Sequence, residues 1–158
     1  MSTPPRFLEG TAPKKYEGVE GWLVVFCLLL IFFVPVSTLY QVFGNVLPLI
    51  SRTHDSRREI LWTVYIVFFL GIAGFGLVTG IRLWLVRPGV VRLAKLWLLA
   101  FFCAHVCYFF LWLALFQGHG SEPVAKIAWG HVVRPLVPFL VWTAYLEYSK
   151  RVRQTYTN

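Results

Sequence analysis

The stretch that decides the fold runs from Ile60 to Ile81 and is written ILWTVYIVFFLGIAGFGLVTGI. It holds no charged residue, and as an α-helix its 22 residues reach about 33 Å at ~1.5 Å per residue, enough to cross the hydrocarbon core of a bilayer. Three further apolar runs have a similar length: Trp22–Phe43, Leu96–Phe116 and Ala128–Tyr148. We therefore predict an all-α integral membrane protein with four transmembrane helices.

The composition supports this prediction. Hydrophobic residues make up 58% of the chain and charged residues 14%, whereas soluble domains contain about half and about a quarter. A chain of 158 residues cannot bury such an excess by itself, so the expected partner is the lipid bilayer. The net charge of +8 would suggest a nucleic-acid partner in a soluble protein. Here Lys and Arg gather at the ends of the apolar runs, and we expect no nucleic acid.

The distribution of Lys and Arg predicts the orientation, because the more basic side of a membrane protein stays in the cytoplasm. Ten of these residues lie on one side, in the first twenty residues, around the second turn and after the fourth run: Arg6, Lys14, Lys15, Arg82, Arg87, Arg92, Lys95, Lys150, Arg151 and Arg153. Four lie on the other: Arg52, Arg57, Arg58 and Lys126. We predict a cytoplasmic N-terminal tail (1–20), an antiparallel four-helix domain (21–149) and a basic cytoplasmic C-terminal tail (150–158).

Arg134 is the one unambiguous charge inside an apolar run. Counted from Ser149, it lies about 22 Å up the fourth helix at ~1.5 Å per residue, in the outer leaflet. It could be an interface anchor whose side chain reaches the headgroups. Alternatively, Arg134 could bind an anionic lipid or substrate group together with His131, three residues earlier on the same helical face.

Small residues form a strip on the second run. Gly76 and Gly80 make a GxxxG pair, and Ala73 extends the same face. Such strips let helices approach closely, either within one bundle or between two copies.

Catalytic and cofactor motifs are not evident. Cys103 and Cys107 share a helical face, but His105 lies about 200° around the helix from Cys103, so we expect no metal and no cofactor. GxSxG and HExxH patterns do not occur, and we expect no enzymatic activity. The leading hypothesis is a non-enzymatic membrane subunit that binds a partner protein or lipid. The alternative is a small transporter or channel for an anionic solute, built as a homo-oligomer.

Several segments resemble a bacterial membrane family known as domain of unknown function 2569. They are Gly21-Trp22-Leu23 with Pro35 in the first run, the lone Arg134, and Tyr145 followed by Ser149-Lys150-Arg151-Val152 and Thr155-Tyr156. The similarity covers nearly the whole chain except the N-terminal tail. It implies a multi-pass protein of the inner membrane with four helices, and it carries no known activity, substrate or cofactor.

Overall fold

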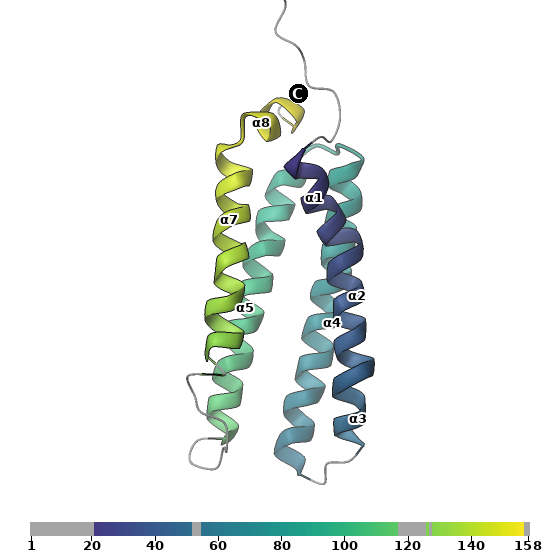
Figure 1. Cartoon of the computed structure of the whole chain (residues 1–158), viewed down its shortest axis with the longest axis vertical. Coiled ribbons are helices and arrows are strands. Elements are labelled where there is room, and N and C mark those ends of the chain that lie inside the picture. Colours follow the sequence, from purple (N-terminus) through teal and green to yellow (C-terminus); the bar gives the residue numbers. More distant parts are fainter. Residues whose placement is uncertain (1–20, 52–54, 117–125, 127, 157–158) are drawn as a thin grey trace, which may run out of the picture.

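The computed structural model describes residues 21–51, 55–116, 126 and 128–156, without the side chains of residues 151 and 154. The elements of this part of the chain are all helices (Figure 1). We label α-helices α and the wider π-helical turns η. In chain order they are α1 (Trp22–Leu28), η1 (Leu29–Phe33), α2 (Val34–Tyr40), η2 (Gln41–Val46), α3 (Leu47–Ile50), α4 (Ser56–Trp84), α5 (Val90–Phe116), η3 (Trp129–Val133), α7 (Arg134–Tyr148) and α8 (Lys150–Tyr156).

Three continuous helices of the described residues are long and apolar enough to cross a membrane: Trp22–Ile50, which we call the first helix, α4 and α5. They contain 29, 29 and 27 residues, about 40 Å each at ~1.5 Å per residue. Large apolar side chains such as Phe32, Val67 and Phe110 are exposed on them. The elements of the described part are thus all helical, as predicted, and have the features of a multi-pass membrane protein. With 15 residues, α7 is by itself short of a span.

The first helix extends further than predicted. We expected it to end near Phe43, with a loop over residues 44–59, because this segment contains polar residues and a proline. In the structure it continues to Ile50. The side-chain amide of Asn45 donates to Oε1 of Gln41, one turn earlier, at 3.1 Å. Asn45 therefore supports the helix here rather than a turn.

Each π-helical turn stands directly before a proline. The turns η1, η2 and η3 end two residues before Pro35, Pro48 and Pro135. Proline has no N–H to donate to the carbonyl four residues earlier, and its ring presses against that carbonyl. A wider turn separates the two groups, so the chain continues as a helix through each proline.

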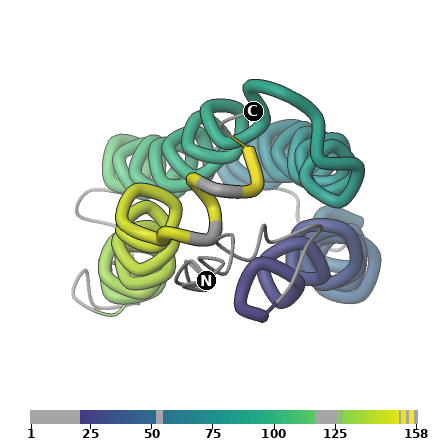
Figure 2. The backbone as a smooth tube through the Cα atoms, turned by 90° about the horizontal axis from the view of Figure 1, so that it is seen from above, coloured from purple at the N-terminus to yellow at the C-terminus, as the bar shows by residue number. Residues whose placement is uncertain are grey.

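Helices that follow one another in the chain pack side by side: the first helix on α4, α4 on α5, and α5 on η3 and α7. Seen from above in Figure 2, α4 and α5 occupy one side, and the first helix and α7 the other. The buried core lies at the end that holds α1, the α4–α5 turn and α8, which we call the closed end. It contains Leu23, Phe26, Cys27, Leu30, Leu83, Val90, Ala94, Trp97, Leu98, Leu146 and Val152. There the rings of Phe26 and Trp142, 4.6 Å apart, join the first helix to α7.

Two glycines set the distances between α4 and its neighbours. The indole Nε1–H of Trp97 on α5 donates to the backbone carbonyl of Ile72 on α4 at 2.9 Å. A Cβ atom at Gly76 would lie 2.8 Å from that Nε1, so only glycine leaves room for the indole. At Gly80 a Cβ atom would lie 2.8 Å from the side chain of Ile31 and 3.3 Å from its backbone nitrogen. The first helix could not approach α4 so closely with any larger residue at this position.

The turn between α4 and α5 is a Schellman motif. The backbone N–H of Arg87 donates to the carbonyl of Arg82 at 3.1 Å, and that of Val86 to the carbonyl of Leu83 at 3.1 Å. Val86 holds the left-handed position of the motif, with φ 50°. Glycine is usual there because a β-branched side chain clashes with the backbone. The motif ends α4 sharply and returns the chain into α5.

Within the segment that we predicted as a basic C-terminal tail, Lys150–Tyr156 form the helix α8. The hydroxyl of Tyr156 donates to the backbone carbonyl of Leu83 at 2.7 Å. Burial, and to a smaller extent the nearby Cys27 and Tyr145, raises the pKa of Tyr156, so the hydroxyl keeps the proton that it donates. This contact fastens α8 to the last turn of α4.

Replacing Gly76 or Gly80 by alanine should destabilise the fold, because the added Cβ would meet atoms at 2.8 Å. We expect each change to lower the free energy of unfolding by about 1–3 kcal/mol. Gly74→Ala is the matched control: nothing lies within 4 Å of its Cβ position, and alanine favours a helix by about 0.5–1 kcal/mol. Thermal unfolding in detergent measures all three. Equal stability of the three variants would contradict the packing role.

Candidate functional site

Five aromatic and histidine side chains meet between α4, α5 and η3. We call Tyr65, Phe69, His105, Tyr108 and His131 the histidine cluster. The rings of Phe69 and His105 meet edge to face with centroids 4.6 Å apart, and those of Tyr108 and His131 are 4.8 Å apart. The two histidine rings are 6.0 Å apart. All five side chains are buried or half-buried, so the cluster is a polar group in apolar surroundings.

Helical spacing explains how the cluster forms. Tyr65 and Phe69 are four residues apart on α4, and His105 and Tyr108 three apart on α5, so each pair lies on one face of its helix. His131 comes from η3, the wider turn that precedes Pro135. The backbone carbonyl of His131 is four residues before Pro135, which has no N–H to donate to it. Such wide turns often occur at functional positions in helices.

The two histidines differ in their hydrogen bonds. Nδ1 of His105 lies 2.9 Å from the backbone carbonyl of Phe101. Because a carbonyl only accepts, this Nδ1 carries the hydrogen, and Nε2 of the neutral ring is left as an acceptor. Nδ1 of His131 is buried and has no hydrogen-bond partner in the described part of the chain. A polar atom in that position suits a hydrogen bond to a ligand or a water molecule.

The two predicted ligand-binding residues lie in different surroundings. The ring of His131 packs into the histidine cluster, whereas the side chain of Arg134, three residues later, is exposed. Among the described residues no hydrogen bond or ion pair joins Arg134 to His131 or to a carboxylate. Arg134 therefore faces the surroundings of the protein, and His131 faces its interior.

The predicted packing residues lie inside the chain. Ala73, Gly76 and Gly80 are all buried on α4. Gly76 lies against Trp97 of α5, and Gly80 against Ile31 of the first helix. The strip is thus covered by this chain's own helices.

The two outer cysteines lie apart from the cluster. Cys103 and Cys107 are exposed on α5, and the ring of His105 between them packs on Phe69 of α4. Within the described ranges no three His, Cys, Asp or Glu side chains come together as a metal site would require.

Sequence reasoning missed two features. The first is the ion pair between Lys95 of α5 and Glu147 of α7, since only Lys95 had been counted, as a charge near the membrane surface. The second is the pair of tyrosines in the histidine cluster, Tyr65 and Tyr108, with ring centroids 5.4 Å apart. Their spacing to Phe69 and His105 was visible in the sequence. Which helices would face each other was not.

Exchanging each histidine for phenylalanine should separate their roles. His105→Phe removes a hydrogen bond to the Phe101 carbonyl, so we expect it to lower the free energy of unfolding by about 1 kcal/mol. His131→Phe keeps a ring beside Tyr108 and removes an unpartnered buried nitrogen, so we expect no loss, or a gain of about 1 kcal/mol. Thermal unfolding of the two variants in detergent makes the comparison. A larger loss for His131→Phe would mean that its nitrogen has a partner in the working protein.

Comparison with known proteins identifies a family. The model of the family described as protein of unknown function (DUF2569) matches residues 16–157. No curated protein and no solved structure matches the chain. Because the match extends over the histidine cluster, Arg134 and all the described helices, the chain belongs to this family of proteins of unknown function.

Proposed function

We propose that this chain is a four-span protein of a bacterial inner membrane and that it works there as a non-enzymatic subunit that binds lipid or a partner membrane protein. The main support is how its interior polar side chains are engaged. Thr79, Trp97, His105 and Tyr156 each bond a backbone carbonyl of a helix, at 2.7–2.9 Å. Donors held in this way stabilise a scaffold and are not free to exchange protons with a substrate. That use of the interior favours binding over catalysis.

The fourth crossing is supported by the length of η3 and α7 together. They run without a break from Trp129 to Tyr148, about 30 Å at ~1.5 Å per residue. The ring of Phe139 stacks on Phe102 of α5 with centroids 5.1 Å apart. This segment therefore packs beside α5, which is long enough to cross a membrane. Arg134 lowers its apolar character, but an arginine near the membrane surface can reach the headgroups.

The orientation is supported by the charge of the closed end. The described Lys and Arg at this end are Arg82, Arg87, Arg92, Lys95, Lys150 and Arg153, and those near the opposite end are Arg57, Arg58 and Lys126. The bond from Tyr156 to Leu83 holds α8 at the closed end. A basic cytoplasmic side then puts both termini in the cytoplasm.

Labelling of single cysteines tests this topology. With the native cysteines replaced by serine, cysteine is introduced at Gly89, Gly120 or Asn158, and intact spheroplasts receive a membrane-impermeant maleimide. We expect labelling at position 120, and labelling at positions 89 and 158 only after permeabilisation. Positions 89 and 158 on opposite sides would mean three crossings, and position 89 outside would reverse the orientation.

Native mass spectrometry of the chain purified in mild detergent tests the binding function. We expect bound lipid or a distinct partner protein at a fixed ratio. A homo-oligomer free of both would contradict the proposal and favour the alternative, a small oligomeric transporter or channel for an anionic solute. One observation favours that alternative, the unpartnered Nδ1 of His131 three residues before Arg134.

Substitution of Arg134 separates the two candidates further. If it only anchors the helix, Arg134→Leu should leave abundance unchanged or raise it, since insertion of an arginine costs about 2.5–3.5 kcal/mol at the centre of a membrane and less near its surface. If it attracts a transported anion, Arg134→Lys should reduce anion flux into proteoliposomes at normal abundance, because lysine lacks the planar fork that holds two oxygens. His131→Ala should then reduce the flux as well.

A further inference from the structure

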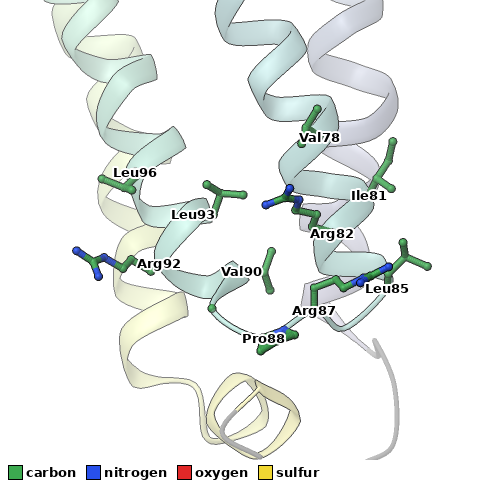
Figure 3. A pocket seen from close by; sticks show the side chains of 11 residues that line it. Val78, Ile81, Arg82, Leu85, Arg87, Pro88, Val90, Arg92, Leu93 and Leu96 are labelled. Carbon is green, nitrogen blue, oxygen red and sulfur yellow. The ribbon is translucent and has the colours of Figure 1, made fainter.

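An open groove lies on the outer surface of the α4–α5 hairpin at the closed end. It has a volume of about 740 Å³. One part of its lining is aliphatic, with Val78 and Ile81 from α4, Leu85 directly after it, and Leu93 and Leu96 from α5 (Figure 3). The other part is cationic, with Arg82, Arg87 and Arg92. We call it the arginine groove.

The three guanidinium groups stand around the groove in different directions. Figure 3 shows Arg82 reaching from α4 into the gap towards α5, while Arg87 lies along the turn and Arg92 extends from the far side of α5. Only the guanidinium group of Arg82 points into the groove, and those of Arg87 and Arg92 lie at its rim on opposite sides. Each is exposed and can change its rotamer to meet a ligand.

In the described part of the chain, no carboxylate is paired with these arginines. Among the described residues the ion pairs are Arg58 with Asp55 at the opposite end and Lys95 with Glu147 on another face. Arg82, Arg87 and Arg92 take part in neither. Three cations that line one groove repel one another, and an anion bound there would relieve this repulsion.

The turn itself brings two of the arginines together. In a Schellman motif the residues at the positions of Arg82 and Arg87 commonly make an apolar contact. Here both positions are arginine, and the backbone of one donates to the backbone of the other at 3.1 Å. Like charges stand where apolar side chains usually pack, a combination that an anionic ligand would stabilise.

The order of the lining along α4 indicates an amphipathic ligand. Val78 and Ile81 belong to the apolar span, and Arg82 and Arg87 follow at its end. A molecule in the groove would thus meet aliphatic side chains at the depth of the acyl chains and guanidinium groups at the depth of the headgroups. Basic pockets between helices on the cytoplasmic side of a membrane bind anionic lipid headgroups in this way.

We propose that the arginine groove binds one anionic phospholipid, with a phosphate oxygen on Arg82, the headgroup between Arg87 and Arg92, and an acyl chain along Val78 and Leu93. The proposal rests on the proposed membrane function and names the ligand class of one site. A soluble anion would use only the arginines. A zwitterionic lipid would bring its own cation next to them and bind more weakly.

The test uses the full chain, purified in mild detergent and titrated with phosphatidylglycerol. Native mass spectrometry counts the bound lipid, and thermal unfolding measures protection. The double variant Arg82→Gln/Arg87→Gln removes two groove charges. The matched control Arg57→Gln/Lys150→Gln removes two exposed charges outside the groove. Val78→Trp fills the aliphatic part and leaves every arginine in place.

We expect phosphatidylglycerol to bind the native chain and the control equally. The groove variant should bind roughly ten- to thirtyfold more weakly, from the loss of two arginines near a lipid surface. Val78→Trp should weaken lipid binding as well. Phosphatidylcholine and inorganic phosphate should give neither a bound species nor protection.

Four results would overturn the proposal: unchanged lipid binding by the groove variant, equal weakening in the groove variant and the control, equal retention of phosphatidylcholine, or protection by inorganic phosphate that Val78→Trp leaves unchanged. The last would indicate a site for a soluble anion. Failure of the wider binding function has a different signature, since the native chain would then carry neither lipid nor partner. Lipid that stays bound to the groove variant as to the native chain would remove this site alone.

Discussion

The hydrogen bond from the Trp97 indole to the Ile72 carbonyl is the contact on which the arrangement of the other helices depends. It forms in a helical interior where a missing partner would be costly, and it exists only because residue 76 has no side chain. The bond holds α5 at a fixed height and distance on α4. Further along the same two helices, this register brings His105 onto Phe69. One glycine therefore influences both the helix packing and the histidine cluster.

The long helices could be predicted from apolar length alone, because a bilayer demands uninterrupted helical hydrogen bonding over a known distance. The end of the first helix could not. Asn45 favours a turn in water, yet its amide bonds Gln41 within the helix. Pro35, Pro48 and Pro135 each follow a wider turn, whereas Pro138 lies within the regular helix α7. Each wider turn changes which residues lie on the same face of the helix, and the spacing of residues in the sequence does not reveal that change.

The same limit applies to the candidate sites. Arg134 and His131 attracted attention as polar residues in an apolar run, and an ideal helix would place them on one face. Because His131 belongs to the wider turn η3 and Arg134 begins α7, one side chain lies inside and the other is exposed. From the sequence alone, we interpreted the arginines of the groove only as signals of membrane orientation, because counting basic residues on each side requires no structure. Their grouping around aliphatic side chains depends on the angle of a turn, and that angle depends on Val86 in a left-handed conformation.

The bond between Tyr156 and Leu83 has a consequence for biosynthesis. The two residues are 73 positions apart, so the ribosome must add that many residues after Leu83 before the contact can form. Until then the last turn of α4 is closed by its Schellman bonds alone. The hairpin of α4 and α5 can enter the membrane early, because its Trp97 contact needs only the two helices. The closed end is completed later, when α8 arrives, so helix insertion and final packing are separate steps in the life of the chain.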